Sequence, residues 1–194
     1  MKDVILIIDM LNDFVSGKIK CERAQLIIPN IKELSSSARR SRFLRNDVEI
    51  VYLNDAHNES DSENKRWGAH AIKGTQGAEV IEELKPRKGD YVIGKTAYSG
   101  FFETGLDPLL RSLNVKTVYL TGLHTNLCAR HTAADAFFRG YNVVAVEDGL
   151  QAFTEKDHIE GLEYLKFAYG VQVRKTEDII KKWEVGKNAK TPQA

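Results

Sequence analysis

The sequence is poor in cysteine and proline and has no long apolar run, and each of these shortages excludes a class of protein. Its 194 residues include only 2 cysteines and 4 prolines. Cys21 and Cys128 can form at most one disulfide, which excludes a disulfide-stapled secreted scaffold. The first apolar run, residues 4–8, is too short for the core of a signal peptide or for a membrane span. We therefore expect a soluble, cytoplasmic protein with both thiols free.

Neither sign of charge is in excess. The chain has 28 Lys and Arg against 27 Asp and Glu, a formal net charge of +1. This balance gives no electrostatic reason to expect nucleic acid or a membrane surface as a partner. The hydrophobic fraction of 42% and the length are typical of one globular domain. We expect that domain to cover residues 1–186, followed by a frayed tail at 187–194 that lacks a core-forming pattern.

Short apolar segments alternate with segments of helical period along the chain. The expected strands are 4–8, 48–55, 91–95, 117–122 and 142–148, with 171–176 as a candidate sixth. The expected helices are 23–45, 77–84, 104–113, 128–139, 155–168 and 176–183. This alternation predicts an α/β fold of three layers (α/β/α) around a doubly wound, mostly parallel sheet of five to six strands.

Charged side chains stand where the expected strands end. Asp9, Asp55, Lys95 and Asp148 each close a strand, and the loop that leads to Cys128 follows another. Ligands of such sheets bind at the carboxyl ends of the strands, so we expect these groups to gather at one edge. Taken alone, Asp9 is read as the cap of the turn that follows it. Together, Asp9 and Lys95 suggest a base and a cation beside the thiol of Cys128.

Cys128 lies at the expected start of a helix. The positive end of the helix dipole lowers the pKa of a thiol there, and free backbone N–H groups can stabilise an oxyanion. A small buried hydrophobic residue is the alternative, and the residues alone leave both interpretations open. Cys21 lies in a polar loop with no partner and is interpreted as incidental.

A second group of residues has the composition of a metal site. Asp55 and His57 are two residues apart at a strand end, and His70 follows a loop that contains Glu63. Imidazoles with carboxylates suit Zn²⁺, Fe²⁺ or Mn²⁺. Histidines in loops are more often simply solvated, so the spacing by itself is a weak signal.

Three segments together resemble one known family. They are "LIIDMLNDF" (6–14), "GKTAYSGFFETGL" (94–106) and "TGLHTNLCARHTAADAFFRGYNVVAVEDG" (121–149). They resemble, in order, the three catalytic segments of the isochorismatase-like superfamily of cysteine hydrolases. The resemblance spans roughly residues 4–175.

The resemblance implies roles for particular residues. It places the catalytic triad on Asp9, Lys95 and Cys128. It also implies an oxyanion hole built from the backbone N–H groups of His124 and Cys128. The alternative is a degenerate family member that has lost its activity and serves as a binding or scaffold protein. The complete triad argues against that interpretation.

The loop after the second expected strand is similar to that of the nicotinamidase (pyrazinamidase) group. "DAH" (55–57) and "ENKRWGAH" (63–70) carry this similarity. It implies hydrolysis of nicotinamide to nicotinate and ammonia through a cysteine thioester, with a divalent metal, foremost Zn²⁺, binding the substrate. The implied metal ligands are Asp55, His57, Glu63 and His70, and the implied aromatic clamp is Phe14, Trp67 and Tyr98.

One position departs from the family pattern. His124 stands where many relatives have a small residue, after what the resemblance implies is a cis peptide bond from Leu123. An imidazole there can narrow the pocket or change the accepted substrate. The alternative function is therefore a metal-free relative acting on another small amide or on an enol ether. Either way the expected partner is a small molecule, and the tendency of relatives to self-associate is compatible with a homo-oligomer.

Overall fold

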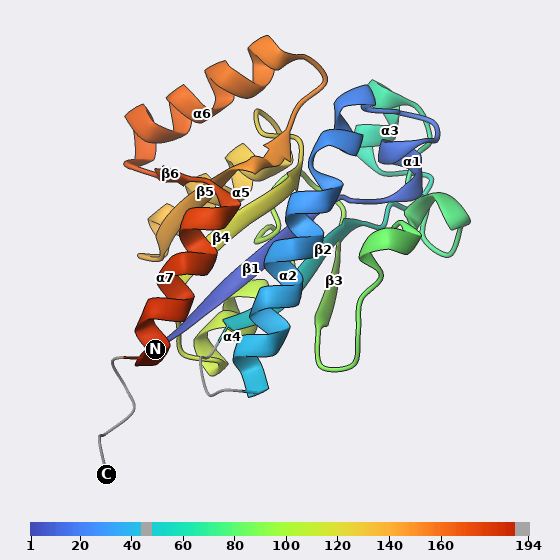
Figure 1. The fold of residues 1–194 in the computed structure, drawn as a ribbon. Coiled ribbons are helices and arrows are strands. Elements are labelled where there is room, and N and C mark those ends of the chain that lie inside the picture. The colour runs from blue at the N-terminus through green and yellow to red at the C-terminus, as the bar shows by residue number, and fades with distance from the viewer. Residues whose placement is uncertain (44–47, 189–194) are drawn as a thin grey trace.

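Six parallel strands form one sheet in the computed structural model, which describes residues 1–43 and 48–188 (Figure 1). The spatial order is β3-β2-β1-β4-β5-β6. The order reverses between β1 and β4, where the chain turns from building one half of the sheet to building the other. Such a switch point is where open α/β sheets bind ligands. The strands are β1 (Lys2–Ile8), β2 (Val48–Asp55), β3 (Tyr91–Lys95), β4 (Val115–Leu123), β5 (Asn142–Gln151) and β6 (Gln172–Arg174).

Helices cover both faces of this sheet. In Figure 1, α2 and α7 lie over one face, whereas α4, α5 and α6 belong to the other. The short helices α1 and α3 lie beyond the carboxyl ends of the strands. The helices are α1 (Asn12–Val15), α2 (Ile28–Phe43), α3 (Ser62–Trp67), α4 (Leu106–Ser112), α5 (Cys128–Phe138), α6 (Glu155–Tyr169) and α7 (Thr176–Asn188), with 3-10 helices η1 (Glu22–Leu26), η2 (Gln76–Ala78) and η3 (Glu82–Leu84).

The central strand β1 explains why its sequence is continuously apolar. Ile5 and Ile7 pack into the core under α2 and α7, and Leu6 and Ile8 pack into the core under α4, α5 and α6. All four side chains are fully buried. Successive residues of a strand point to opposite faces, so a strand buried on both faces must be apolar at every position.

The predicted fold class is confirmed, with differences in individual elements. The strands expected at 48–55 and 91–95 have those bounds. The helix expected at 23–45 divides into η1 and α2, and positions 44–45 lie outside the described residues. Helix α7 extends past 183 to Asn188, and of the expected tail only 187 and 188 are described.

The prediction of a helix at 77–84 is wrong. That stretch forms two short 3-10 turns, because Val80 between them lies extended in an antiparallel bridge with Leu11. The N–H of Ile81 donates to the carbonyl of Met10 at 3.1 Å. These backbone bonds to the segment after β1 override the local helical period.

None of the helices within residues 1–43 and 48–188 has both the length and the apolar character needed to cross a membrane.

Candidate active site

The sheet topology brings three distant charged or nucleophilic side chains to one place. Asp9 follows β1, Lys95 ends β3, and Cys128 begins α5, which follows β4. Close packing of β4 against β1 depends on Gly122, whose φ is +97° and whose position would place a Cβ 2.0 Å from the carbonyl oxygen of Ile8. Only glycine fits there. The expected convergence at the carboxyl edge of the sheet is thus what the structure shows for these three residues.

A buried ammonium group lies at the centre of the cluster. Lys95 Nζ is 2.8 Å from Asp9 Oδ2 and 3.6 Å from Cys128 Sγ, and it also donates to Asp55 Oδ1. Asp9 Oδ2 is thus held in an ion pair with the ammonium, and Asp9 also interacts with the thiol of Cys128. The other oxygen, Asp9 Oδ1, accepts the backbone N–H of Asp55 at 2.8 Å. One carboxylate oxygen is therefore fixed by the backbone, and the other faces the ammonium and can take a proton from the neighbouring thiol.

The protonation states follow from burial. Burial, together with the neighbouring carboxylate of Asp55, raises the pKa of Asp9 to about 6 against the pull of Lys95. Burial also raises the pKa of the Cys128 thiol well above its ordinary value; Lys95 opposes this, and Asp9 and Asp55 add to it. The expectation that the helix start lowers this pKa is wrong, because desolvation of the buried sulfur outweighs the nearby positive charge. The resting site therefore holds a neutral thiol beside a base.

Several backbone N–H groups beside the thiol lack acceptors. The N–H of Thr125 donates to Gln151, and those of Leu127 and Ala129 donate to the carbonyl of His124. In contrast, the N–H groups of His124 and Cys128 donate to no acceptor in the part of the chain that the structure describes. The peptide bond from Leu123 to His124 is cis, as expected. These two free donors are suited to a developing oxyanion.

Four side chains in the neighbouring loop form a group that could hold a metal ion. Donor atoms of Asp55, His57, Glu63 and His70 all lie within 4.8 Å of one another. His57 Nε2 is fully buried without a hydrogen-bond partner, 3.5 Å from Asp55 Oδ2 and 3.9 Å from Glu63 Oε2. A buried nitrogen facing two carboxylates fits a cation between them, and a set of two imidazoles and two carboxylates suits Zn²⁺, Fe²⁺ or Mn²⁺.

Surrounding groups orient the two imidazoles. His57 Nδ1 is 3.3 Å from Asp61 Oδ2, and His70 Nδ1 is 2.7 Å from the carbonyl of Gly68. A proton on each Nδ1 leaves Nε2 as the metal-binding nitrogen. Sequence reasoning missed Asp13, whose buried carboxylate accepts the N–H of Ala71, next to His70, at 2.8 Å. It also missed α3, which carries Glu63 into the cluster.

Asp148 does not join the site. Its Oδ1 accepts the backbone N–H and the hydroxyl of Thr176, both at 2.9 Å. Strand β5 continues to Gln151, three residues beyond the expected end, so Asp148 lies within the strand and serves the start of α7.

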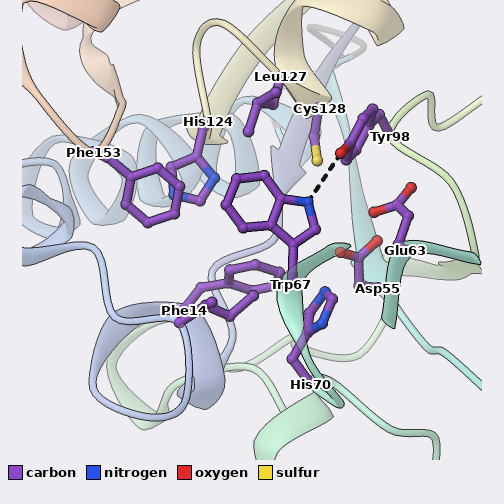
Figure 2. Close-up of a pocket in the computed structure, with 11 residues that line it drawn as sticks. Phe14, Asp55, Glu63, Trp67, His70, Tyr98, His124, Leu127, Cys128 and Phe153 are labelled. Atoms are coloured by element: carbon purple, nitrogen blue, oxygen red, sulfur yellow. Dashed lines mark hydrogen bonds between the residues drawn. The ribbon is translucent and has the colours of Figure 1, made fainter. Parts of the chain in front are cut away.

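An aromatic pocket opens over the thiol (Figure 2). The empty space inside it is about 270 Å³, including the part that is open to solvent. The indole Nε1 of Trp67 donates to Tyr98 Oη at 2.9 Å, which links two of the expected clamp residues. Phe153, just after β5, was not foreseen, because its distance in sequence gave no sign that it faces the thiol. The lining is Phe14, Ile19, Asp55, Glu63, Trp67, His70, Tyr98, His124, Leu127, Cys128 and Phe153.

Comparison with known proteins points to one family. The model of the Isochorismatase domain matches residues 3–178. The structure of N-carbamoylsarcosine amidase from Thermoplasma acidophilum superimposes with a TM-score of 0.84 at 38% identity, covering 91% of this chain and 98% of that one. Nicotinamidase PncA from Bacillus subtilis gives 0.81 at 31% identity, covering 90% and 100%.

A third solved structure bears on the group of Asp55, His57, Glu63 and His70, hereafter the metal-type cluster. Pyrazinamidase of Pyrococcus horikoshii, crystallised in complex with zinc, has a TM-score of 0.80 at 26% identity and covers 90% of this chain and 99% of that one. The solved structures that the chain resembles are therefore amidases named for different substrates.

Proposed function

Because this chain belongs to the isochorismatase family of hydrolases, we propose that it is a cysteine amidohydrolase that converts nicotinamide into nicotinate and ammonia. In this proposal the enzyme acts in the cytoplasm on a small-molecule amide and supplies nicotinate for NAD salvage.

The observation that carries the proposal is that Asp55 joins two clusters. Its Oδ1 accepts from Lys95, which contacts Asp9 and Cys128. Its Oδ2 faces His57 in the metal-type cluster. A molecule bound at that cluster would therefore lie beside the thiol. Nicotinamide has a ring nitrogen that can face the metal-type cluster and an amide carbonyl that can face the thiol.

The acylation step uses the neutral thiol and the Oδ2 atom of Asp9. Asp9 Oδ2 takes the proton of Cys128, and the sulfur forms a bond to the amide carbon. The carbonyl π electrons move to the oxygen, which accepts from the N–H groups of His124 and Cys128. As the oxyanion collapses, the C–N bond breaks and Asp9 gives its proton to the leaving nitrogen. Ammonia and a thioester result.

The deacylation step returns the enzyme to its resting state. Asp9 removes a proton from water, whose oxygen adds to the thioester carbon. When this second oxyanion collapses, the C–S bond breaks and the sulfur regains the proton from Asp9. The buried ammonium of Lys95 stabilises the anionic states of both side chains throughout, being within 3.6 Å of the sulfur.

The residues Asp55, His57, Glu63 and His70 would hold the divalent ion, with Zn²⁺ as the first choice. When bound, this ion supplies a Lewis acid for the ring nitrogen of the substrate. The chain's own contribution is to flank the ring with Phe14, Trp67 and Tyr98, which line the pocket.

An ammonia-release assay with a panel of small amides tests the proposal, together with metal analysis of the purified enzyme. We expect turnover of nicotinamide, about one divalent ion per chain, and loss of turnover in Cys128→Ala. Turnover of nicotinamide that survives in Cys128→Ala would contradict the thioester route.

One observation favours a second candidate, hydrolysis of a different small amide. The match to N-carbamoylsarcosine amidase has higher identity than the match to nicotinamidase, 38% against 31%. In the same panel, turnover of N-carbamoylsarcosine by metal-free enzyme, with nicotinamide left intact, would select this candidate.

A further inference from the structure

We propose that the side chain of His124 recognises an uncharged polar substituent on the ring of the amide substrate, so that the preferred substrate is a hydroxyl-, amino- or oxo-substituted pyridine carboxamide. This inference rests on the proposed function and specifies the substrate class within it.

The imidazole of His124 is held by rings rather than by hydrogen bonds. It stacks on Phe153 with ring centroids 4.1 Å apart and planes 25° apart, and it meets the edge of Phe14 at 5.9 Å. The residue is 2% exposed, and its Nε2 is completely buried without a hydrogen-bond partner. Packing therefore fixes the position of the ring and leaves its polar capacity unused.

This unpaired nitrogen distinguishes His124 from the other residues of the pocket. Within the described part of the chain, no other pocket-lining residue has a buried side-chain nitrogen or oxygen without a partner. The buried, unpaired Nε2 of His57 belongs to the metal-type cluster and is accounted for there. Buried polar atoms are nearly always paired in folded proteins, so an unpaired one at a binding site indicates a ligand group.

The place of His124 defines which part of the substrate it meets. Figure 2 shows His124 and Phe153 on one side of the Trp67 indole, with Asp55 and Glu63 on the other. A ring whose nitrogen is directed toward the metal-type cluster presents its opposite edge to His124. The substituent is therefore on the part of the ring remote from the metal-type cluster.

The charge state of His124 limits the chemistry of the substituent. Burial lowers the pKa of His124 to about 4, so the imidazole is neutral near pH 7. A neutral imidazole offers one N–H donor and one acceptor nitrogen, and its tautomer can adapt to either need. Hydroxyl, amino and oxo groups can pair with it, whereas a carboxylate would require a positive charge that burial disfavours.

Steady-state kinetics with matched substrates test the inference. The assay compares kcat/KM for hydroxyl- and amino-substituted nicotinamides with kcat/KM for nicotinamide, in the wild type and in His124→Phe. The substitution keeps a ring to stack on Phe153 and removes both nitrogens. We expect the wild type to prefer a substituted amide by roughly tenfold, the worth of one hydrogen bond, and the variant to lose this preference.

His131→Phe is the matched control. His131 lies in α5, which begins four residues after His124; it is exposed and bonds through Nδ1 to the carbonyl of Leu127. Its ring also packs against Tyr98 with centroids 5.3 Å apart, and phenylalanine keeps a ring for that contact. We expect this variant to keep the wild-type ratio. An equal ratio in the wild type and His124→Phe would overturn the inference while leaving the proposed function intact.

A binding measurement separates failure of the inference from failure of the proposed function. If the wild type hydrolyses none of these amides, the proposed function is wrong. Titration calorimetry of the same amides with Cys128→Ala, with and without His124→Phe, then tests recognition alone. Tighter binding of the substituted amide that depends on His124 supports the inference, and no such difference, or no binding, refutes it.

Discussion

Replacing Lys95 by Met removes the buried positive charge of the site and keeps the apolar stem of the side chain. In the native protein this ammonium is fully buried between the carboxylates of Asp9 and Asp55. Burial lowers the pKa of Lys95, but the two carboxylates outweigh this and raise it well above its ordinary value. After the substitution, two buried carboxylates share a site without a compensating cation.

The magnitude follows from the burial of the charges. Removing one partner of a buried ion pair costs about 3–5 kcal/mol, because the remaining charge has lost both water and its counter-ion. For a chain of this size that corresponds to a fall in Tm of about 6–20 °C. Without Lys95, the folded-state pKa of each carboxyl is higher, so the folded variant binds protons more tightly than the unfolded chain does. The difference in unfolding free energy between the wild type and the variant therefore becomes smaller as the pH falls from 7 to 5.

Urea unfolding of chelator-treated protein at pH 7 and pH 5 measures both effects. Lys85→Met is the matched control, since Lys85 pairs with Glu82 on the surface and the two side chains are 60% and 79% exposed. We expect that control to change the unfolding free energy by less than about 1 kcal/mol. A Lys95→Met protein as stable as the control at pH 7 would refute the view that this ammonium balances the buried carboxylates.

Three further predictions follow from the site. Asp9 acts as a base only when ionised and its pKa is about 6, so kcat/KM measured against pH should fall with a midpoint near pH 6 on the acid side; a flat profile down to pH 5 would exclude this role. Asp13→Ala removes the acceptor of the N–H next to His70 and should weaken Zn²⁺ binding by roughly 10–100-fold in competition with a chromophoric chelator; unchanged affinity would argue that His70 needs no such support. The folded-state pKa of His124, about 4, lies below its ordinary 6.5, so its stabilising contribution is complete above pH 6.5 and is lost as the pH falls to 4. Wild type should therefore lose about 3 kcal/mol more than His124→Phe in urea unfolding across that interval, and parallel losses would show that the imidazole is not held neutral.

Several features were predictable because they depend on local pattern. A strand buried on both faces of a parallel sheet must be apolar at every position, so the run at residues 4–8 identified the centre of the sheet. The alternation of such runs with helical segments gave the fold class. Because parallel strands end at one edge, the placement of Asp9, Asp55 and Lys95 followed from their positions at strand ends.

Other features depend on contacts between segments far apart in sequence. Val80 is extended because Leu11 pairs with it, although its own neighbourhood has a helical period. The start of α5 suggested a lowered pKa for the Cys128 thiol, but the pKa is raised because residues from other segments of the chain bury the sulfur. Phe153 reaches the pocket only because β5 continues to Gln151.

The amino-acid sequence by itself determined the layered sheet and the placement of the carboxylate, the ammonium and the thiol at one edge of it. Hydrophobic periodicity and position at a strand end are local properties of the sequence. The tertiary structure alone decided the charge states of these groups and the unpaired nitrogen of His124. Desolvation and hydrogen-bond pairing are set by which atoms surround a group in space, and those atoms come from every part of the chain.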